Sequence, residues 1–596
     1  MSARPDEPDG PAPNVLREYA LIADGERGAV VGPRGDIAWL CAPRWDSPSV
    51  FSSLIGGTGA YVVEPVGRHV WGGWYRNGTL IWHSRWVTAQ GAVECQDALA
   101  YPGDEHRTVV LRRIRALDCA SSFRVALEPR AGYDREPMRE LKAERGIWNA
   151  RAGDLYLRWT CGSGARSVAG RRLELRIDLA AGEEHDLVLE ISDRPLPAEP
   201  PDPGRAWTAT AAAWSNDVPD CQRGLAARDA RHSYAVLRGM TNPRGGTVAA
   251  ATTSLPERAD AGRNYDYRYT WIRDQCYVGQ ALACDGPHGL VADAVRVVTE
   301  RLLEHGPKLA PAYTVTGDPV PSPSHLELPG YPGGADVVGN WVNDQFQLDA
   351  FGESLQLLAA AAGHDLLDDD GWHAARVAAD AIAARWQEPD SGIWEIEPRA
   401  WTHSRLTAAA GLRAIAAVSP AGGPATDWLG LADRIVADTS ATSVHPSGRW
   451  QRAPDDPGLD AALLFAGLRG SVPADDPRNR ATLEAYLREL TVDGFAYRFR
   501  HDERPLADAE GSFLLCGFLV ALSLQQQGDP VAARAWFERT RAACGPPQLF
   551  SEEYDVGQHQ MRGNLPQAFV HALMLETAFR LWREEPDALD PTHSET

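Results

Sequence analysis

Glutamate, aspartate and arginine side chains that could perform acid and base chemistry gather with aromatic residues in three short segments. The segments read YDYRYTWIRD at residues 265–274, SGIWEIEPRAWTHSR at residues 391–405 and FSEEYDVGQHQMRGNLPQAF at residues 550–569. A rigid scaffold commonly displays its functional groups on the segments that connect its helices or strands. We therefore predict that these three segments carry the functional residues.

The second segment contains a tryptophan–glutamate pair, Trp394 and Glu395. A carboxyl group held against an indole face loses hydration and stays protonated near neutral pH, as a general acid must. The pattern predicts that Glu395 is a general acid. An ordinary loop glutamate gives the same two letters, so the pair alone leaves that alternative open.

The third segment places Glu552, Glu553 and Asp555 within four positions. One carboxylate of such a group can stay ionised as a general base while its neighbours hydrogen-bond water or protein. A solvated acidic turn is the competing interpretation. The histidines of these segments, His403 and His559, and His571 just beyond them, are interpreted as structural residues.

The first segment ends with Arg273 and Asp274 after four aromatic residues. An arginine and an aspartate side by side can donate to and accept from adjacent sugar hydroxyls, whereas an Arg–Asp bridge at the start of a helix explains the pair equally well. The chain also holds 20 Trp residues, whose flat apolar faces suit sugar rings, although burial in a core accounts for many of them.

The chain that must position these segments changes its periodicity near residue 194. Between residues 19 and 193, short alternating runs such as TVVLRRIRAL and HDLVLEIS predict an antiparallel β-sandwich after an extended or disordered tail at residues 1–18. The proline-rich segment RPLPAEPPDPG, residues 194–204, is interpreted as a stiff extended linker, and we place the whole linker at residues 194–222.

Residues 223–590 show helical periodicity in about a dozen amphipathic segments. An even set of antiparallel helix pairs can close into an (α/α)6 barrel whose loops at one end enclose a pocket. An open helical solenoid is the alternative, but no repeat of the length that such arrays show is visible. The predicted fold is therefore a β-sandwich followed by an all-helical barrel.

Composition excludes several classes of function. The net charge of −22 disfavours nucleic acid and anionic lipid as partners, and no apolar run is long enough to span a membrane. The N-terminus has no secretion signal, so a cytoplasmic location is expected. Nine cysteines without CxxC pairing indicate reduced thiols, and we expect no metal and no cofactor.

Taken together, the three segments resemble the signature regions of glycoside hydrolase family 15, the glucoamylase-like family, in the same order along the chain. The resemblance extends to the N-terminal stretch YALIADGERGAVVGPRGDIAWLCAPRWDSPSVF and to AAATTSLPE at residues 249–257. It implies a β-sandwich followed by an (α/α)6 barrel, and hydrolysis of a glycosidic bond in one step with inversion.

By motif matching, the resemblance makes Glu395 the general acid and Glu552 the general base. It implies further substrate-binding residues at positions that match the family's motifs, namely Tyr267, Arg273, Asp274, Trp341, Trp394 and Arg498. Inversion demands that the two carboxyls stand about 6.5 to 9.5 Å apart, so that a water fits between one of them and the sugar.

The sequence indicates the substrate less directly than it indicates the type of reaction. We expect an exo-acting α-glucosidase that releases glucose from soluble α-1,4 or α-1,6 gluco-oligosaccharides, because the sequence shows neither a secretion signal nor a starch-binding module. Bacterial members of the family with similar motifs hydrolyse trehalose, so an α,α-trehalase using the same two glutamates is the alternative. Ile396 stands where fungal members carry a second acidic residue, which leaves the leaving-group preference open.

Two further alternatives come from other classes. A phosphorolytic enzyme would replace the activated water with phosphate, but the presence of Glu552 argues against it. A catalytically silent carbohydrate sensor would need no carboxylate pair, and both candidates are present. The sequence is compatible with a monomer or a homodimer.

Overall fold

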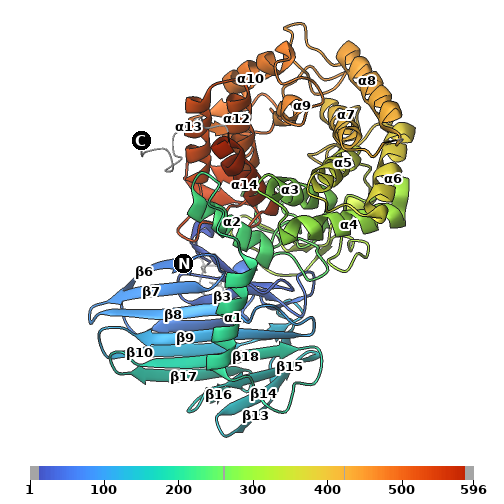
Figure 1. Cartoon of the computed structure of the whole chain (residues 1–596). Coiled ribbons are helices and arrows are strands. Elements are labelled where there is room, and N and C mark those ends of the chain that lie inside the picture. Colours follow the sequence, from blue (N-terminus) through green and yellow to red (C-terminus); the bar gives the residue numbers. More distant parts are fainter. Residues whose placement is uncertain (1–12, 260–261, 422, 584–596) are drawn as a thin grey trace, which may run out of the picture.

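The computed structural model describes residues 13–259, 262–421 and 423–583 and divides into a β domain and a ring of helices (Figure 1). The order of the two parts along the chain confirms the predicted fold class, an antiparallel β domain followed by an (α/α)6 barrel. Of the predicted tail, residues 1–12 lie outside the described residues, and Leu16–Glu18 forms a single 3₁₀ turn. Residues 584–590 of the predicted barrel also lie outside them.

The β domain consists of two large antiparallel sheets. The first has the order β1-β2-β3-β5-β10-β17-β16, and β4 pairs with β3 beside this row. Its strands are β1 (Ala20–Ala23), β2 (Gly28–Val31), β3 (Asp36–Cys41), β4 (Ser49–Phe51), β5 (Ala60–Pro65), β10 (Ser121–Glu128), β16 (Arg166–Val168) and β17 (Arg172–Leu179). The second has the order β13-β14-β15-β18-β9-β8-β7-β6. Its strands are β6 (His69–Tyr75), β7 (Trp82–Thr88), β8 (Ala92–Leu99), β9 (Arg107–Ala116), β13 (Arg139–Glu144), β14 (Ile147–Ala152), β15 (Leu155–Thr160) and β18 (Glu184–Ser192).

Alternation of buried and exposed residues explains why these segments form strands. In β17, every second side chain is buried and the intervening ones face solvent, as period-2 patterning requires. Between the sheets, the buried Arg112 of β9 donates to Asp97 at 2.7 Å and to the backbone oxygens of Tyr61 and Gly35 at 2.8 and 2.7 Å. This arginine ties the two sheets together, because Tyr61 lies in β5 of the opposite sheet.

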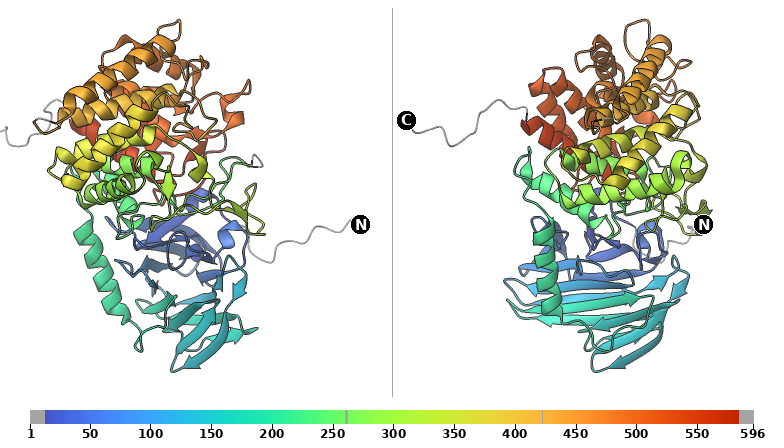
Figure 2. Two further views of the ribbon diagram at one scale, coloured as in Figure 1. Left: turned by 90° about the vertical axis from the view of Figure 1, so that its right-hand side faces the viewer. Right: turned by 45° about the vertical axis from the view of Figure 1, so that its right-hand side comes forward.

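The linker predicted at residues 194–222 contains a helix over much of its length. Pro203–Asp217 forms helix α1, which runs along the outside of the β domain and contacts β9 and β18 (Figure 2). Proline is favoured at the first turn of a helix, and the Asp202 side chain caps α1 by accepting from Arg205 N at 2.8 Å. The buried indoles of Trp207 and Trp214 then fix the helix to the sheets.

The helical ring alternates between outer and inner helices along the chain. Six outer helices are α2 (Ala227–Gly239), α4 (Gly289–His305), α6 (Asp369–Arg385), α8 (Ala425–Thr442), α10 (Pro477–Glu489) and α13 (Pro530–Arg541) in the described part. Six inner helices there are α3 (Ile272–Ala283), α5 (Asp349–Ala362), α7 (Thr402–Ala417), α9 (Phe465–Leu468), α12 (Leu514–Gln526) and α14 (Ala568–Arg583). Each inner helix contacts the next, and α14 returns to α3, which closes the ring (Figure 1).

Residue patterning decides which helices lie inside. In α3 every residue is buried, and α12, with the sequence LLCGFLVALSLQQ, is apolar on nearly all sides. In α4 only the face formed by Leu290, Val291, Val298, Leu302 and their neighbours is buried, and the charged side chains lie opposite. No helix within the described ranges is both long enough and apolar enough to cross a lipid bilayer.

The β domain supports the segment that enters α3. Arg268 is fully buried and pairs with Asp266 at 2.7 Å. The same guanidinium donates to the backbone oxygen of Ser47 and to the hydroxyl of Tyr133, both at 2.9 Å, in the β domain. Residues 265–271 are therefore fixed between the two parts of the molecule before the chain enters the barrel.

Candidate active site

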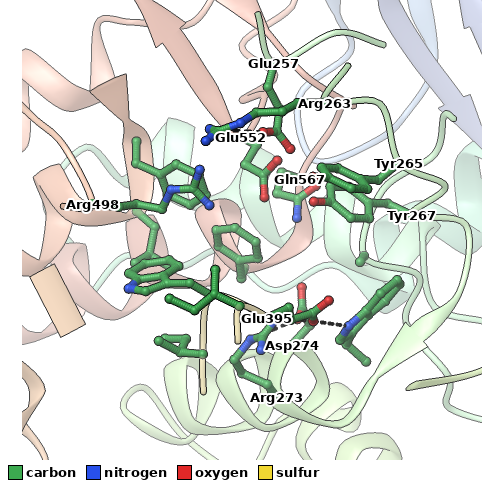
Figure 3. A pocket seen from close by; sticks show the side chains of 18 of the residues that line it. Glu257, Arg263, Tyr265, Tyr267, Arg273, Asp274, Glu395, Arg498, Glu552 and Gln567 are labelled. Carbon is green, nitrogen blue, oxygen red and sulfur yellow. Dashed lines mark hydrogen bonds and ion pairs between the residues drawn. The ribbon is translucent and has the colours of Figure 1, made fainter. Parts of the chain in front are cut away.

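One cavity of about 150 Å³ brings the three chemistry-bearing segments together at the end of the barrel (Figure 3). All eight residues that the sequence singles out line it: Tyr267, Arg273, Asp274, Trp341, Trp394, Glu395, Arg498 and Glu552. In Figure 3, Glu395 and Glu552 lie on different sides of this cavity and both point into it. Segments almost 300 residues apart in sequence thus meet at one place, and their roles there remain proposals.

Glu395 lies on the loop between α6 and α7, with its carboxyl held through one oxygen. Oε1 accepts a hydrogen bond from Trp271 Nε1 at 2.7 Å and one from an Arg273 amino nitrogen at 3.3 Å. Both of these hydrogen bonds go to Oε1, which leaves Oε2 to meet a ligand. The backbone of Glu395 has a φ of 54°, a left-handed conformation that costs a residue with a side chain about 1–3 kcal/mol and is common at functional sites.

Arg273 and Asp274 lie in the first turn of inner helix α3 and not in a loop. Arg273 Nε is 3.8 Å from Asp274 Oδ2, and an amino nitrogen of Arg273 donates to Gln347 Oε1 at 3.3 Å. Burial raises the pKa of Asp274 to about 6, against the opposing charge of Arg273. Asp274 Oδ1 is buried without a hydrogen-bond partner among the described residues, and the cavity is where a hydroxyl donor could reach it.

Aromatic rings form one wall of the cavity. Tyr265 and Tyr267 stack at 6.0 Å between centroids, Tyr267 meets Trp271 edge-on at 5.6 Å, and Trp341 meets Tyr265 edge-on at 5.5 Å. Trp341 is 48% exposed, which places it at the mouth and not in the depth of the cavity. Burial, followed by the charges of Glu552 and other cavity carboxylates, raises the pKa of Tyr267 above its ordinary value.

Glu552 precedes the short strand β26 (Glu553–Asp555) and is 5% exposed. Burial raises its pKa well above the ordinary range, the charge of Glu257 raises it further, and the charge of Arg498 lowers it. The neighbours that the sequence suggested turn elsewhere: Glu553 Oε2 accepts from Gly511 N at 2.8 Å, and Asp555 pairs with Arg562 at 3.4 Å. The carboxyl that meets Glu552 belongs to Glu257.

Arg498 and Trp394 pack together beside the two glutamates. Arg498 donates to Glu510 Oε2 at 2.6 Å, lies 3.6 Å from Glu553 and faces the rings of Phe513 and Trp394 at 4.5 and 5.6 Å. The indole nitrogen of Trp394 donates to Asp460 at 2.7 Å. The indole that hydrogen-bonds Glu395 is therefore that of Trp271, which sequence reasoning did not single out.

The histidines that the sequence assigned to structure are buried or lie outside the cavity lining. Burial lowers the pKa of His403 to about 3, and its Nε2 lies 3.1 Å from the Thr407 hydroxyl. His571 accepts from Phe550 N at 3.2 Å and lies 3.0 Å from the Ser233 hydroxyl. Within the described ranges, no group of three or more His, Cys, Asp or Glu side chains has the arrangement of a metal site.

Several polar residues of the cavity escaped the sequence analysis. They are Glu257, Arg263, Trp271, His501 and Gln567. Glu257 ends the stretch AAATTSLPE, which was noted for its resemblance but not for its chemistry. Gln567 Oε1, like Glu552 Oε2, is buried without a hydrogen-bond partner in the described structure, so the cavity offers several acceptors that a hydroxylated ligand or water would satisfy.

Comparisons with known proteins identify the family of this chain and several relatives. The family described as Glycosyl hydrolases family 15 matches residues 230–579, and one described as Trehalase-like, N-terminal, matches residues 9–153. A protein named Trehalase from Mycolicibacterium smegmatis is 30% identical over 624 aligned residues, which cover 96% of this chain and 92% of the relative. Trehalase 1 of Sulfolobus acidocaldarius is 26% identical and covers 94% of this chain and 98% of its own length.

A solved structure shares the whole architecture. A bacterial glucoamylase in complex with acarbose superposes with a TM-score of 0.72, covering 98% of this chain and 96% of that chain, at 14% sequence identity. At this identity the likeness establishes the fold, in which a β domain precedes the helical barrel.

Proposed function

Because the chain belongs to glycoside hydrolase family 15, a family of inverting hydrolases, we propose that it is an α,α-trehalase that splits trehalose into two glucose molecules. The chain is a glycoside hydrolase, and a carbohydrate is its substrate. The observation that carries the finer proposal is the match to proteins named trehalase over nearly the whole chain, the β domain included.

This proposal reverses the preference drawn from the sequence for α-1,4 or α-1,6 oligoglucosides. That preference depended on the absence of a starch-binding module, which disfavours granular starch but does not distinguish among small α-glucosides. The likeness to a glucoamylase structure supports the fold alone. Ile396 lines the cavity, so an apolar side chain stands beside the proposed acid where fungal glucoamylases carry an acidic one.

The acid step requires a proton on the oxygen of Glu395 that faces the substrate. Trp271 and Arg273 both donate to Oε1, so the proton belongs on Oε2, which has no hydrogen-bond partner among the described residues. From there it can pass to the glycosidic oxygen as the bond to the anomeric carbon breaks. The two donors fix the carboxyl in one orientation before substrate arrives.

The base step requires Glu552 in its ionised form. Its carboxylate takes a proton from a water that attacks the anomeric carbon from the face opposite the leaving oxygen. Arg498 favours the ionised form, while burial opposes it. Asp274 and Arg273 supply one acceptor and one donor group at the floor of the cavity for the hydroxyls of the glucose that is attacked.

Glucose release from a panel of trehalose, maltose, isomaltose and longer α-glucans tests the proposal. We expect trehalose to be the best substrate by kcat/KM. Proton NMR early in the reaction should show one β-glucose and one α-glucose per trehalose, because only the attacked anomeric centre inverts. Preferential cleavage of maltose or longer glucans would overturn the trehalase proposal, and formation of α-glucose alone would overturn inversion.

A further inference from the structure

A second carboxyl group lies directly against the proposed base. Glu257 and Glu552 are each 5% exposed, both line the catalytic cavity, and their carboxyl groups lie next to each other, close enough to share a hydrogen bond (Figure 3). Gly563 closes over the pair: a Cβ there would stand 3.6 Å from Glu257 Cγ and 3.5 Å from Glu552 Cβ. Gly563 N also donates to the Pro256 backbone oxygen at 2.8 Å, which fixes the two segments to each other.

Two buried carboxyl groups in contact cannot both carry full charge, so the pair retains a proton at pH values where isolated carboxyls are ionised. Burial is the largest cause that raises the pKa of each member. The charged and titratable groups around the pair are Arg263, Arg498, His501, Glu510, Glu553, Tyr265 and Tyr267.

The charges of the two arginines lower the pKa of Glu257, but burial outweighs them and the pKa stays above its ordinary value. Arg263 is 3.9 Å from Glu257 but 3.2 Å from Glu510. Arg498 donates to Glu510 at 2.6 Å and lies 3.6 Å from Glu553. Glu510 therefore takes most of the positive charge, and a proton shared between Glu257 and Glu552 is the remaining way to lower their repulsion.

Glu257 also borders a second cavity of about 190 Å³ behind the base. Its other lining residues include Arg258, Glu510, Asp555, Gln558 and Arg562. Gln558 is exposed, so this second cavity opens to solvent. Glu257 thus lines both the catalytic cavity and a second polar cavity that leads to water.

We propose that Glu257 is a positioning residue: it shares a proton with Glu552 in a carboxyl–carboxyl hydrogen bond, holds that side chain toward the attacking water and exchanges protons with solvent through the second cavity. The inference extends the proposed function, since it assigns the partner of the proposed base. Before the reaction the pair holds one shared proton, and Glu395 holds another.

The proton balance follows from that starting state. As the water oxygen bonds to the anomeric carbon, the shared proton moves onto Glu257, one water proton passes to Glu552, and the proton of Glu395 goes to the leaving glucose. The second water proton stays on the new hydroxyl of the product. The pair then holds two protons and Glu395 none, and release of one proton to solvent and uptake of one by Glu395 restore the enzyme.

The test compares Glu257→Ala with Glu257→Gln, because the glutamine amide can donate to Glu552 in place of the carboxyl but cannot take up a proton. We expect the alanine variant to lose about 100-fold in kcat with KM changed less than about threefold, and the glutamine variant to recover to within about tenfold of wild type. Glu397→Gln, at an exposed glutamate of the 391–405 segment, is the matched control.

Infrared difference spectroscopy at pH 7 provides a readout that does not depend on turnover. The wild type should show the carbonyl stretch of a protonated carboxyl that is absent from Glu257→Gln and from Glu552→Gln, while circular dichroism verifies that each variant is folded. An alanine variant within threefold of wild type, a glutamine variant no better than alanine, or an unchanged infrared signal in Glu257→Gln would overturn the proposal. A wild type that hydrolyses none of the sugars would overturn the proposed function instead.

Discussion

The two ends of the cavity hold their glutamates by opposite means. At the end of the proposed acid, called the acid end, the Glu395 side chain is 20% exposed, rests on a loop in a left-handed conformation and receives two hydrogen bonds on one oxygen. At the end of the proposed base, called the base end, Glu552 is 5% exposed and meets another carboxyl. The acid end thus leaves one oxygen without a hydrogen-bond partner, whereas the base end encloses its carboxyl beside a second one.

This difference teaches that two glutamates of equal chemistry can be given unlike roles by their partners alone. Indole and guanidinium donors orient a carboxyl without competing for its second oxygen. A neighbouring carboxyl responds to the charge of the base and compensates for it. The roles proposed for Glu395 and Glu552 depend on this asymmetry, which suggests experiments on each end separately.

Replacing the two glutamates in turn should give the largest effects. We expect Glu552→Gln and Glu395→Gln each to lower kcat on trehalose by about 10³- to 10⁴-fold, because general base or general acid catalysis is lost. Fluorescence titration should show that both variants still bind trehalose.

A substrate that needs no acid separates the two variants. Fluoride leaves without protonation, so α-glucosyl fluoride should restore most of the activity of Glu395→Gln and little of that of Glu552→Gln. Equal recovery of both variants would contradict the assignment of acid and base, and recovery of Glu552→Gln alone would reverse it.

The sequence predicted those parts of the molecule that local patterns determine. Period-2 alternation marked the β domain, and helical periodicity marked the dozen barrel helices, because each pattern repeats within a few residues. Helix α1 was missed because its proline, at position 203, was interpreted as a breaker when it stands at the first turn. The eight cavity residues were found through the resemblance of whole motifs and not through any single pair of letters.

The sequence could not show which side chains contact each other across the barrel. Trp271 is 124 positions from Glu395, and Glu257 is 295 positions from Glu552, so only the closed barrel shows which side chains meet. The same holds for buried charge: the sequence around Asp390 does not indicate that its carboxyl is buried against the backbone of Leu348, 42 positions earlier.

A smaller effect should come from Asp390, which supports the loop of the acid end. Asp390 Oδ2 accepts from Leu348 N, Gly392 N and Ser404 Oγ at 3.2, 3.0 and 2.8 Å, and burial raises its pKa to about 8. The native state keeps this proton up to about pH 8, whereas the unfolded chain releases it near the ordinary value of 3.8. The stability that the protonated group contributes is therefore full below that lower value and is lost as pH rises toward 8.

Asp390→Asn should mimic the protonated form and flatten this dependence. We expect the free energy of unfolding of the wild type to fall more steeply with pH than that of the variant between about pH 4 and 8, by on the order of 1 kcal/mol per pH unit. Urea unfolding at several pH values measures both slopes. Asp455→Asn, whose side chain is 73% exposed in wild type, is the control and should keep the wild-type slope. Equal slopes for wild type and Asp390→Asn would show that the carboxyl is ionised in the folded protein.

The smallest effect should come from the indole that orients the acid. Trp271→Phe removes only the Nε1–H donor to Glu395 Oε1 and leaves Arg273 as the remaining donor, so kcat should fall about tenfold or less, as expected for one hydrogen bond. Because the hydrogen bond positions the acid, α-glucosyl fluoride should be cleaved at nearly the wild-type rate. Trp401→Phe, outside the cavity lining, should leave both rates unchanged. A loss on the fluoride equal to that on trehalose would mean that Trp271 acts on the shape of the sugar subsite and not through Glu395, and the contrast between the two ends would then depend on Arg273 alone.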